Sequence, residues 1–222
     1  MAGSANFHRF VDSFHDGGTT RERYESFDLT ALSSLEGAER EAAEVLLLER
    51  LAKQEEDPRV PPALVVLRAS PAARAGLRQA LAAYPNDRTR VAVAEALWQV
   101  ERHAPAVEVL VEIARTATLP DRRIAASNAL RDIPGPEADE ALLHVVEHDE
   151  DDTSRMAAEI ALFEKYRIEG LRRVPGTVST ISSRLRSPDE TAREAALREL
   201  RTLVENLRAG RSPGDPGPIP TG

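Results

Sequence analysis

Two histidines one helical turn apart are the first residues whose types and spacing could support chemistry. The stretch from His144 to His148 reads H-x-x-E-H, a pattern in which both histidines bind zinc and Glu147 acts as a general base. Such a centre also needs a third protein ligand and a cleft. Because the stretch lies on a helix beside Leu142 and Val146, which the repeat needs for packing, we interpret the histidines as solvent-exposed and predict no metal and no cofactor.

An acidic run, Asp149–Asp152, follows directly. It lacks the alternating ligands and the central glycine of a calcium-binding loop, so we predict a solvated turn. As a functional feature, Asp149, Glu150 and Asp151 would form an acidic contact for a basic partner. The sequence contains no G-x-S-x-G elbow, no glycine-rich phosphate loop and no cysteine, which excludes a thiolate nucleophile. We therefore predict a protein without enzymatic activity.

The elements that carry these residues are predicted to be helices. The chain has 222 residues, of which 41% are hydrophobic and only 4% aromatic, and its apolar residues recur at helical spacing. This composition favours closely packed helices over a β-sandwich. Since no apolar run reaches about 18 residues and the N-terminus lacks a signal-peptide pattern, we expect no membrane segment and a cytoplasmic location.

The net charge of −8 indicates which partners to expect. A negative field repels the phosphate backbone of nucleic acids, so nucleic acid is disfavoured as a partner. The same field favours a protein partner with a basic surface.

Five aspartates, each at the start of a helical pattern, reveal an internal repeat. They are separated by 30, 34, 31 and 37 residues. An aspartate at a helix start accepts hydrogen bonds from free backbone N–H groups, so its recurrence indicates repeated helix starts. These aspartates are Asp57, Asp87, Asp121, Asp152 and Asp189.

The segments between these starts keep the same register. Arg90–Leu97, Arg123–Leu130 and Arg155–Leu162 each begin with arginine and end with Ala-Leu, at spacings of 33 and 32 residues. Proline and glycine interrupt the helical period at regular points, which predicts pairs of helices that must stack to bury their apolar faces. The predicted pairs are 38–55 with 58–68, 70–83 with 87–101, 104–116 with 121–132, 137–148 with 153–167, and 175–186 with 189–209.

The stretches Asn86–Leu97 and Pro120–Leu130 resemble the second helix of bacterial HEAT-like repeats of the PBS-lyase type. The resemblance covers residues 38–209, with a departure at Thr89, Arg122 and Ser154, where the family usually has an aliphatic residue. It implies an all-α fold, a right-handed α-solenoid of about five HEAT-like helix pairs that acts as a protein-interaction scaffold.

Three parts of the chain are expected. Residues 1–36 form an N-terminal helical cap, because an apolar stripe at helical spacing follows Ser4 as a possible N-cap. This cap seals the first repeat or, alternatively, docks a partner. Residues 37–209 form the repeat solenoid, and the Pro/Gly-rich residues 210–222 form a disordered tail. The stripe consists of Phe7, Phe10, Val11 and Phe14.

A second apolar stripe supplies the candidate partner-binding residues. In the helix 87–101 the core face consists of Val93, Ala96, Leu97 and Val100, whereas Val91 and Trp98 point roughly the opposite way. By the resemblance, second helices line the concave surface, where aromatic and arginine side chains are suited to binding. Alternatively, these side chains pack against the adjacent repeat. The candidates are Val91, Glu95, Trp98, Asn128, Arg131, Glu159 and Phe163, together with the acidic residues Asp149, Glu150 and Asp151.

The leading functional hypothesis is a non-catalytic binding protein. Acidic HEAT-like proteins with an N-terminal helix and a segment like Tyr24–Leu29 are similar to immunity proteins that neutralise polymorphic bacterial toxins by occlusion. Alternatives are a general scaffold of a multiprotein complex and an accessory factor similar to the HEAT-like phycobilin lyases, which requires a tetrapyrrole pocket. A DNA-lesion-binding solenoid needs a basic groove, which the net charge disfavours.

Overall fold

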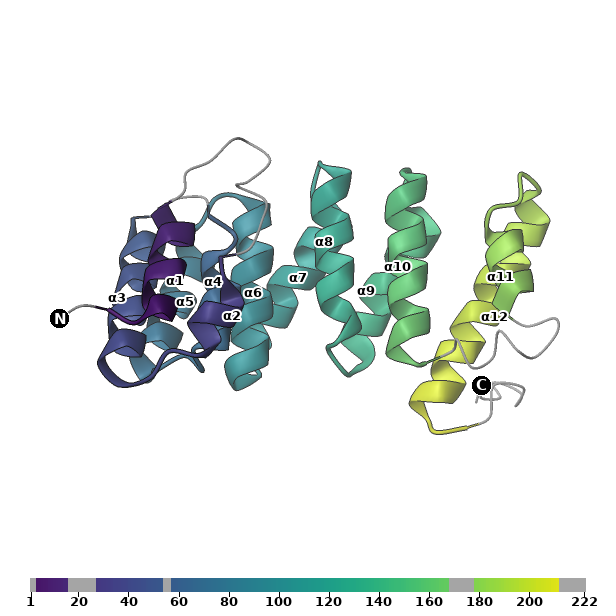
Figure 1. The fold of residues 1–222 in the computed structure, drawn as a ribbon. Coiled ribbons are helices and arrows are strands. Elements are labelled where there is room, and N and C mark those ends of the chain that lie inside the picture. Colours follow the sequence, from purple (N-terminus) through teal and green to yellow (C-terminus); the bar gives the residue numbers. More distant parts are fainter. Residues whose placement is uncertain (1–2, 16–26, 54–56, 168–177, 212–222) are drawn as a thin grey trace. The chain divides into compact units, whose positions relative to one another are not determined.

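The computed structural model describes residues 3–15, 27–53, 57–167 and 178–211, and within these ranges it contains twelve α-helices and no strand (Figure 1). The prediction of an all-α fold built from adjacent helix pairs, as in a HEAT-repeat α-solenoid, is confirmed. The chain divides into two compact units, Met1–Val109 and Leu110–Gly222. Their boundary falls inside α7 (Ala104–Thr116).

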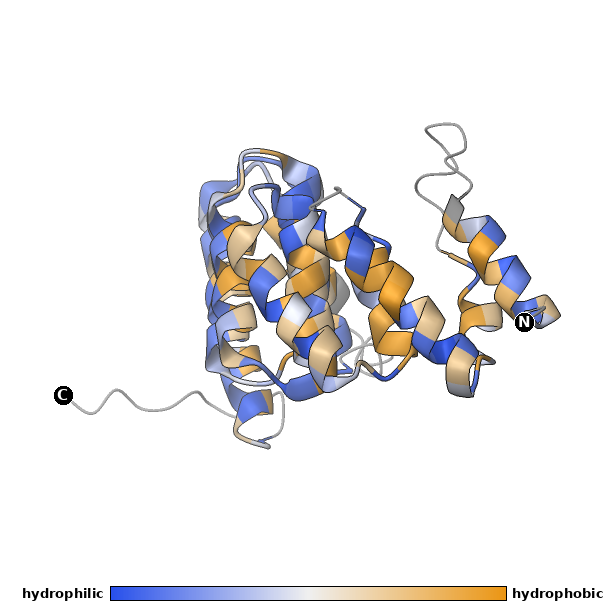
Figure 2. Cartoon of the chain, turned by 90° about the vertical axis from the view of Figure 1, so that its left-hand side faces the viewer, coloured by the Kyte–Doolittle hydropathy of each residue, from blue (hydrophilic) through white to orange (hydrophobic). Residues whose placement is uncertain are grey.

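The first unit is built from short antiparallel helix pairs behind an N-terminal segment. Within it, α3 packs against α4 and α5, and α6 packs against both α4 and α5. In Figure 2 the helices in view carry both hydrophobic and hydrophilic bands, as expected of amphipathic helices. Besides the start of α7, its helices are α1 (Ala5–His15), α2 (Leu29–Ser33), α3 (Gly37–Ala52), α4 (Val60–Val66), α5 (Pro71–Ala83) and α6 (Asp87–Glu101).

In the second unit, α10 lies at the centre of the packing. It contacts α8 and α9, while α11 packs against α12, and α12 also contacts α9. Figure 1 shows α8 and α10 side by side. Its helices after α7 are α8 (Pro120–Arg131), α9 (Pro136–His148), α10 (Asp152–Lys165), α11 (Val178–Leu185) and α12 (Glu190–Arg208).

The helix starts follow the predicted chemistry. Asp151 and Asp189 are N-caps whose side chains accept hydrogen bonds from the backbone N–H groups two or three residues on. Asp87, Asp121 and Asp152 lie in the first turns of their helices, where a negative charge complements the helix dipole. The described helices agree with the predicted ranges to within a few residues at each end. Asp57 is the exception among the predicted starts, because the N-cap of α4 is Arg59.

The N-terminal cap turns its aromatic stripe inward. Ser4 accepts a hydrogen bond from the N–H of Phe7, as predicted of an N-cap. Phe10 and Phe14 are buried together with Phe27, and the three ring centroids lie 5.5–6.2 Å apart. The guanidinium of Arg50 in α3 lies 3.7 Å from the centre of the Phe14 ring. The first unit therefore covers Phe10 and Phe14, whereas Phe7 and Val11 are half-buried, and docking of a partner by the stripe stays a prediction.

Some residues singled out in the sequence are not described by the structure, and others are buried. Residues 24–26 and the tail segment 212–222 lie outside the described residues. Thr89 and Ser154, which depart from the family pattern, are both buried, and the Ser154 hydroxyl donates to Asp151 at 3.0 Å.

None of the helices that the structure describes is both long and apolar enough to cross a lipid bilayer.

Candidate functional site

Two large apolar side chains are exposed on one face of α10. Met156 and Ile160, one helical turn apart, have exposed fractions of 42% and 41%. Their neighbours Ala158, Leu162 and Phe163 are buried and hold α10 in the core of the second unit. Because water-exposed apolar side chains that lie together often indicate an interaction site, this face is the candidate site.

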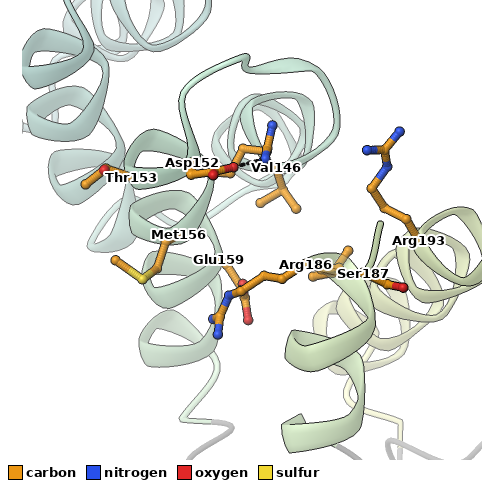
Figure 3. A pocket seen from close by; sticks show the side chains of 10 residues that line it. Val146, Asp152, Thr153, Met156, Glu159, Arg186, Ser187 and Arg193 are labelled. Carbon is orange, nitrogen blue, oxygen red and sulfur yellow. Dashed lines mark hydrogen bonds and ion pairs between the residues drawn. The ribbon is translucent and has the colours of Figure 1, made fainter. Parts of the chain in front are cut away.

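A hollow of about 250 Å³ lies beside this face (Figure 3). Its lining residues come from α9 and α10 on one side, and from the end of α11, the turn that follows and the start of α12 on the other. Apolar lining comes from Val146, Met156 and Leu185, and the remaining lining is polar or charged. The polar lining residues are Asp152, Thr153, Arg155, Glu159, Arg186, Ser187 and Arg193.

Glu159 is the buried charge of this hollow, with an exposed fraction of 4%. Its Oε1 accepts a hydrogen bond from the hydroxyl of Ser182 in α11. Arg186 approaches the other oxygen, with Nη2 at 3.6 Å from Oε2, while the Arg186 side chain remains 59% exposed. The structure thus places one sequence-predicted site residue in a hollow next to the exposed apolar face.

Two side chains of the acidic run, Asp149 and Asp151, form hydrogen bonds within the second unit. The carboxylate of Asp149 is nearly buried and accepts two hydrogen bonds from the Arg123 guanidinium, at 2.6 and 2.8 Å, which raise the pKa of Arg123. Backbone hydrogen bonds at the start of α10 lower the pKa of Asp151. Glu150 is exposed and lines a second hollow of about 210 Å³ with Arg115, His144 and His148. Partner binding by these three acids stays a prediction.

The candidate partner-binding residues of the first unit differ in how far they are buried. Val91 is buried, as expected of the alternative in which these side chains pack within the protein. Trp98 is half-buried, and the guanidinium of Arg102 lies 5.0 Å from its ring centre. Glu95 is half-buried and accepts a hydrogen bond from Gln99.

The remaining candidates belong to the second unit. Phe163 is buried, so for its ring the alternative of packing describes the structure. Asn128 is exposed, and the Arg131 guanidinium forms ion pairs with Glu164 at 2.7 Å and Asp132 at 3.3 Å. Sequence reasoning missed Met156, Ile160 and Arg186 as parts of one surface, because helical periodicity alone does not show which face a neighbouring helix covers.

The carboxylate of the H-x-x-E-H stretch has a basic partner. Arg201 of α12 hydrogen-bonds to Glu147, which lowers the pKa of that carboxyl. Desolvation lowers the pKa of His144, whose ring centroid lies 4.7 Å from that of His148. Within the described ranges, no three histidine, aspartate or glutamate side chains are placed to share a metal ion.

Comparison with known families gives one match. Residues 74–162 match the family model of HEAT repeats. The matched stretch runs from within α5 to within α10 and so includes Met156, Glu159 and Ile160. Comparisons with curated proteins and with solved structures found no match. The family match supports a HEAT-like repeat protein.

Proposed function

We propose that this HEAT-like repeat protein is a non-catalytic protein-binding module whose α10 face contacts a partner. The observation that carries the proposal is the pair Met156 and Ile160, exposed beside a hollow with a buried carboxylate. HEAT repeats typically mediate protein interactions, and the match to that family includes these residues.

A partner that covers the α10 face would remove the exposed parts of Met156 and Ile160 from water. Full burial of a large aliphatic side chain contributes about 1.5–3 kcal/mol. Because Met156 and Ile160 are already more than half covered in the free protein, a partner that covers the rest gains roughly 1 kcal/mol from each. Methionine is also flexible and adapts to irregular surfaces, which suits Met156 to a binding role.

More specifically, we propose an immunity protein that neutralises a bacterial toxin by covering it. Support comes from the net charge of −8, which favours a partner with a basic surface. Inhibition by occlusion requires no bond to be made or broken in this chain. A general scaffold of a multiprotein complex is the alternative outcome of the experiment below.

The test is affinity capture from the native host followed by binding measurements on the captured protein. The double variant Met156→Ser/Ile160→Ser should weaken the affinity about tenfold or more, because it removes two apolar contacts while leaving the core intact. Loss of a toxic activity on binding would favour immunity, and capture of several structural proteins would favour a scaffold.

Leu119→Ser is the matched control, since Leu119 is an equally exposed apolar residue (54%) of the same unit but lies at the start of α8. It should leave the affinity unchanged. If the double variant bound the partner as tightly as the wild-type protein does, the α10 face would not be the binding site.

A further inference from the structure

We propose that Glu159 receives a basic side chain of the partner, arginine or lysine, at the position that Arg186 holds loosely in the free protein. This inference rests on the proposed function and names the chemistry of the partner at one point of the contact. It is carried by the burial of Glu159, the geometry of Arg186 and the lining of the hollow.

The Glu159 carboxylate is buried but incompletely paired. A carboxylate can accept about four hydrogen bonds, whereas within the described part of the chain Glu159 accepts one, from Ser182. Burying a charge is unfavourable unless it is paired and hydrogen-bonded. A buried carboxylate that borders a hollow therefore has unused capacity for a donor from outside.

Arg186 fills this position only in part. Its Nη2 lies 3.6 Å from Oε2 of Glu159, an ion pair beyond hydrogen-bond distance, and 59% of its side chain is exposed. Figure 3 shows Arg186 reaching toward Glu159 from the opposite wall of the hollow. Because exposed ion pairs contribute little, a better-placed cation from a partner can displace it.

The rest of the hollow suits a long basic side chain. Val146, Met156 and Leu185 provide apolar lining for the aliphatic stem of an arginine or lysine, whose charged end then reaches Glu159. The hollow also contains Arg193, whose guanidinium forms no hydrogen bond or ion pair with the described residues and would attract an anion. Since Arg193 is exposed and hydrated, its need for a partner is smaller than that of the buried carboxylate.

The experiment titrates the free protein with arginine amide and follows backbone amide signals by NMR. In the wild-type protein we expect saturable shifts at Ser182 and Arg186. Arg186→Ala removes the internal competitor and should raise the affinity about two- to fivefold, the effect of one exposed ion pair. Glu159→Gln should abolish the shifts while keeping the size of the side chain.

Controls separate this site from general attraction to an acidic protein. Glu194→Gln removes the exposed carboxylate that Arg198 pairs with at 3.7 Å on α12, and it should not change the titration. Citrulline amide, which is neutral, should not bind. Weaker binding of arginine amide to Arg186→Ala, or undiminished shifts in Glu159→Gln, would overturn the proposal.

The two proposals fail in different ways. If arginine amide does not bind but Met156→Ser/Ile160→Ser weakens the captured partner, the α10 face binds a protein and Glu159 is not its receptor for a basic group. If arginine amide binds at Glu159 but the double variant has no effect on the partner, the protein-binding role of the α10 face fails and the basic-group site remains.

Discussion

At the scale of single residues, a second buried carboxylate lies beside a buried cation. Asp139 in α9 has no exposed surface. The ammonium of Lys165 lies 2.7 Å from its Oδ1, and the hydroxyl of Tyr166 donates to Oδ2 at 2.6 Å. Lys165 also donates to the carbonyl of Ile133 at 2.5 Å. The cation beside Asp139 is buried, whereas the cation beside Glu159 is largely exposed. This difference indicates a structural role for Asp139.

Asp139→Asn should therefore destabilise the protein by about 3–5 kcal/mol, because it leaves the Lys165 ammonium buried without a counter-charge. Tyr166→Phe, which removes one hydrogen bond to a charged group, should cost about 1.5–3 kcal/mol. Urea denaturation of the three proteins measures both values. A smaller effect of Asp139→Asn than of Tyr166→Phe would contradict the assignment of the ion pair.

The same cluster predicts a pH dependence. Burial, followed by the hydrogen bond to Asp139, raises the pKa of the Tyr166 hydroxyl above its ordinary value of 10.0. A raised pKa in the folded state means that this contribution is present below pH 10 and is lost as the pH rises further. Tyr166→Phe should remove that alkaline loss of stability.

Residue types predicted the candidate site only in part. Glu159 was identified from its place in the repeat, but its burial depends on α11 and on Ser182, which lies 23 positions away in sequence. For Val91 and Phe163 the sequence left open whether they face a partner or pack within the protein, and both are buried. A single helical period cannot distinguish a solvent face from a face covered by another helix.

At the scale of elements, both the starts and the ends of the helices in the repeat region were predicted to within a few residues. Starts follow from aspartate, asparagine and proline, whose effects are local. The five-residue α2 (Leu29–Ser33) is too short to show a period and was not predicted. Chain reversals after α4 and α6 place Arg68 and Arg102 in the left-handed conformation, with φ of 57° and 54°, where glycine is the usual residue.

Arg68→Gly should stabilise the protein by about 1 kcal/mol, because glycine adopts this conformation without the steric cost that a side chain imposes. Arg68 is exposed. Arg102→Gly is the matched comparison and should gain less, since it also removes the contact of the guanidinium with the Trp98 ring at 5.0 Å. Thermal and urea unfolding report both changes; equal gains would mean that the Arg102–Trp98 contact contributes nothing to stability.

At the scale of the whole molecule, composition and repeat pattern predicted more than residue chemistry did. An all-α fold of paired helices followed from the regular spacing of aspartates, prolines and Ala-Leu pairs, and residues 74–162 match the HEAT repeats. The division into two units within α7 was not predicted. A local sequence period does not show where segments far apart in the sequence make few contacts, and such a place is what separates two units. Net charge is a property of the whole chain, so its consequence for binding is also tested on the whole chain.

The final prediction concerns how the partner is reached. With a net charge of −8 and a basic partner, long-range attraction accelerates the encounter, and salt screens that attraction over a Debye length of about 10 Å at 0.1 M. We expect the association rate constant, measured by stopped flow between about 0.05 and 0.5 M NaCl, to fall at least about tenfold, while the dissociation rate constant changes much less.

A charge variant localises this effect to the surface. Glu150→Lys changes an exposed acid next to the α10 start and should slow association without affecting stability, because Glu150 forms no part of the Arg123–Asp149 pair. Asp149→Asn instead breaks that nearly buried pair and should destabilise the fold. An association rate constant that does not respond to salt would exclude electrostatic steering and, with it, a basic partner surface as the reason for the acidic composition of the chain.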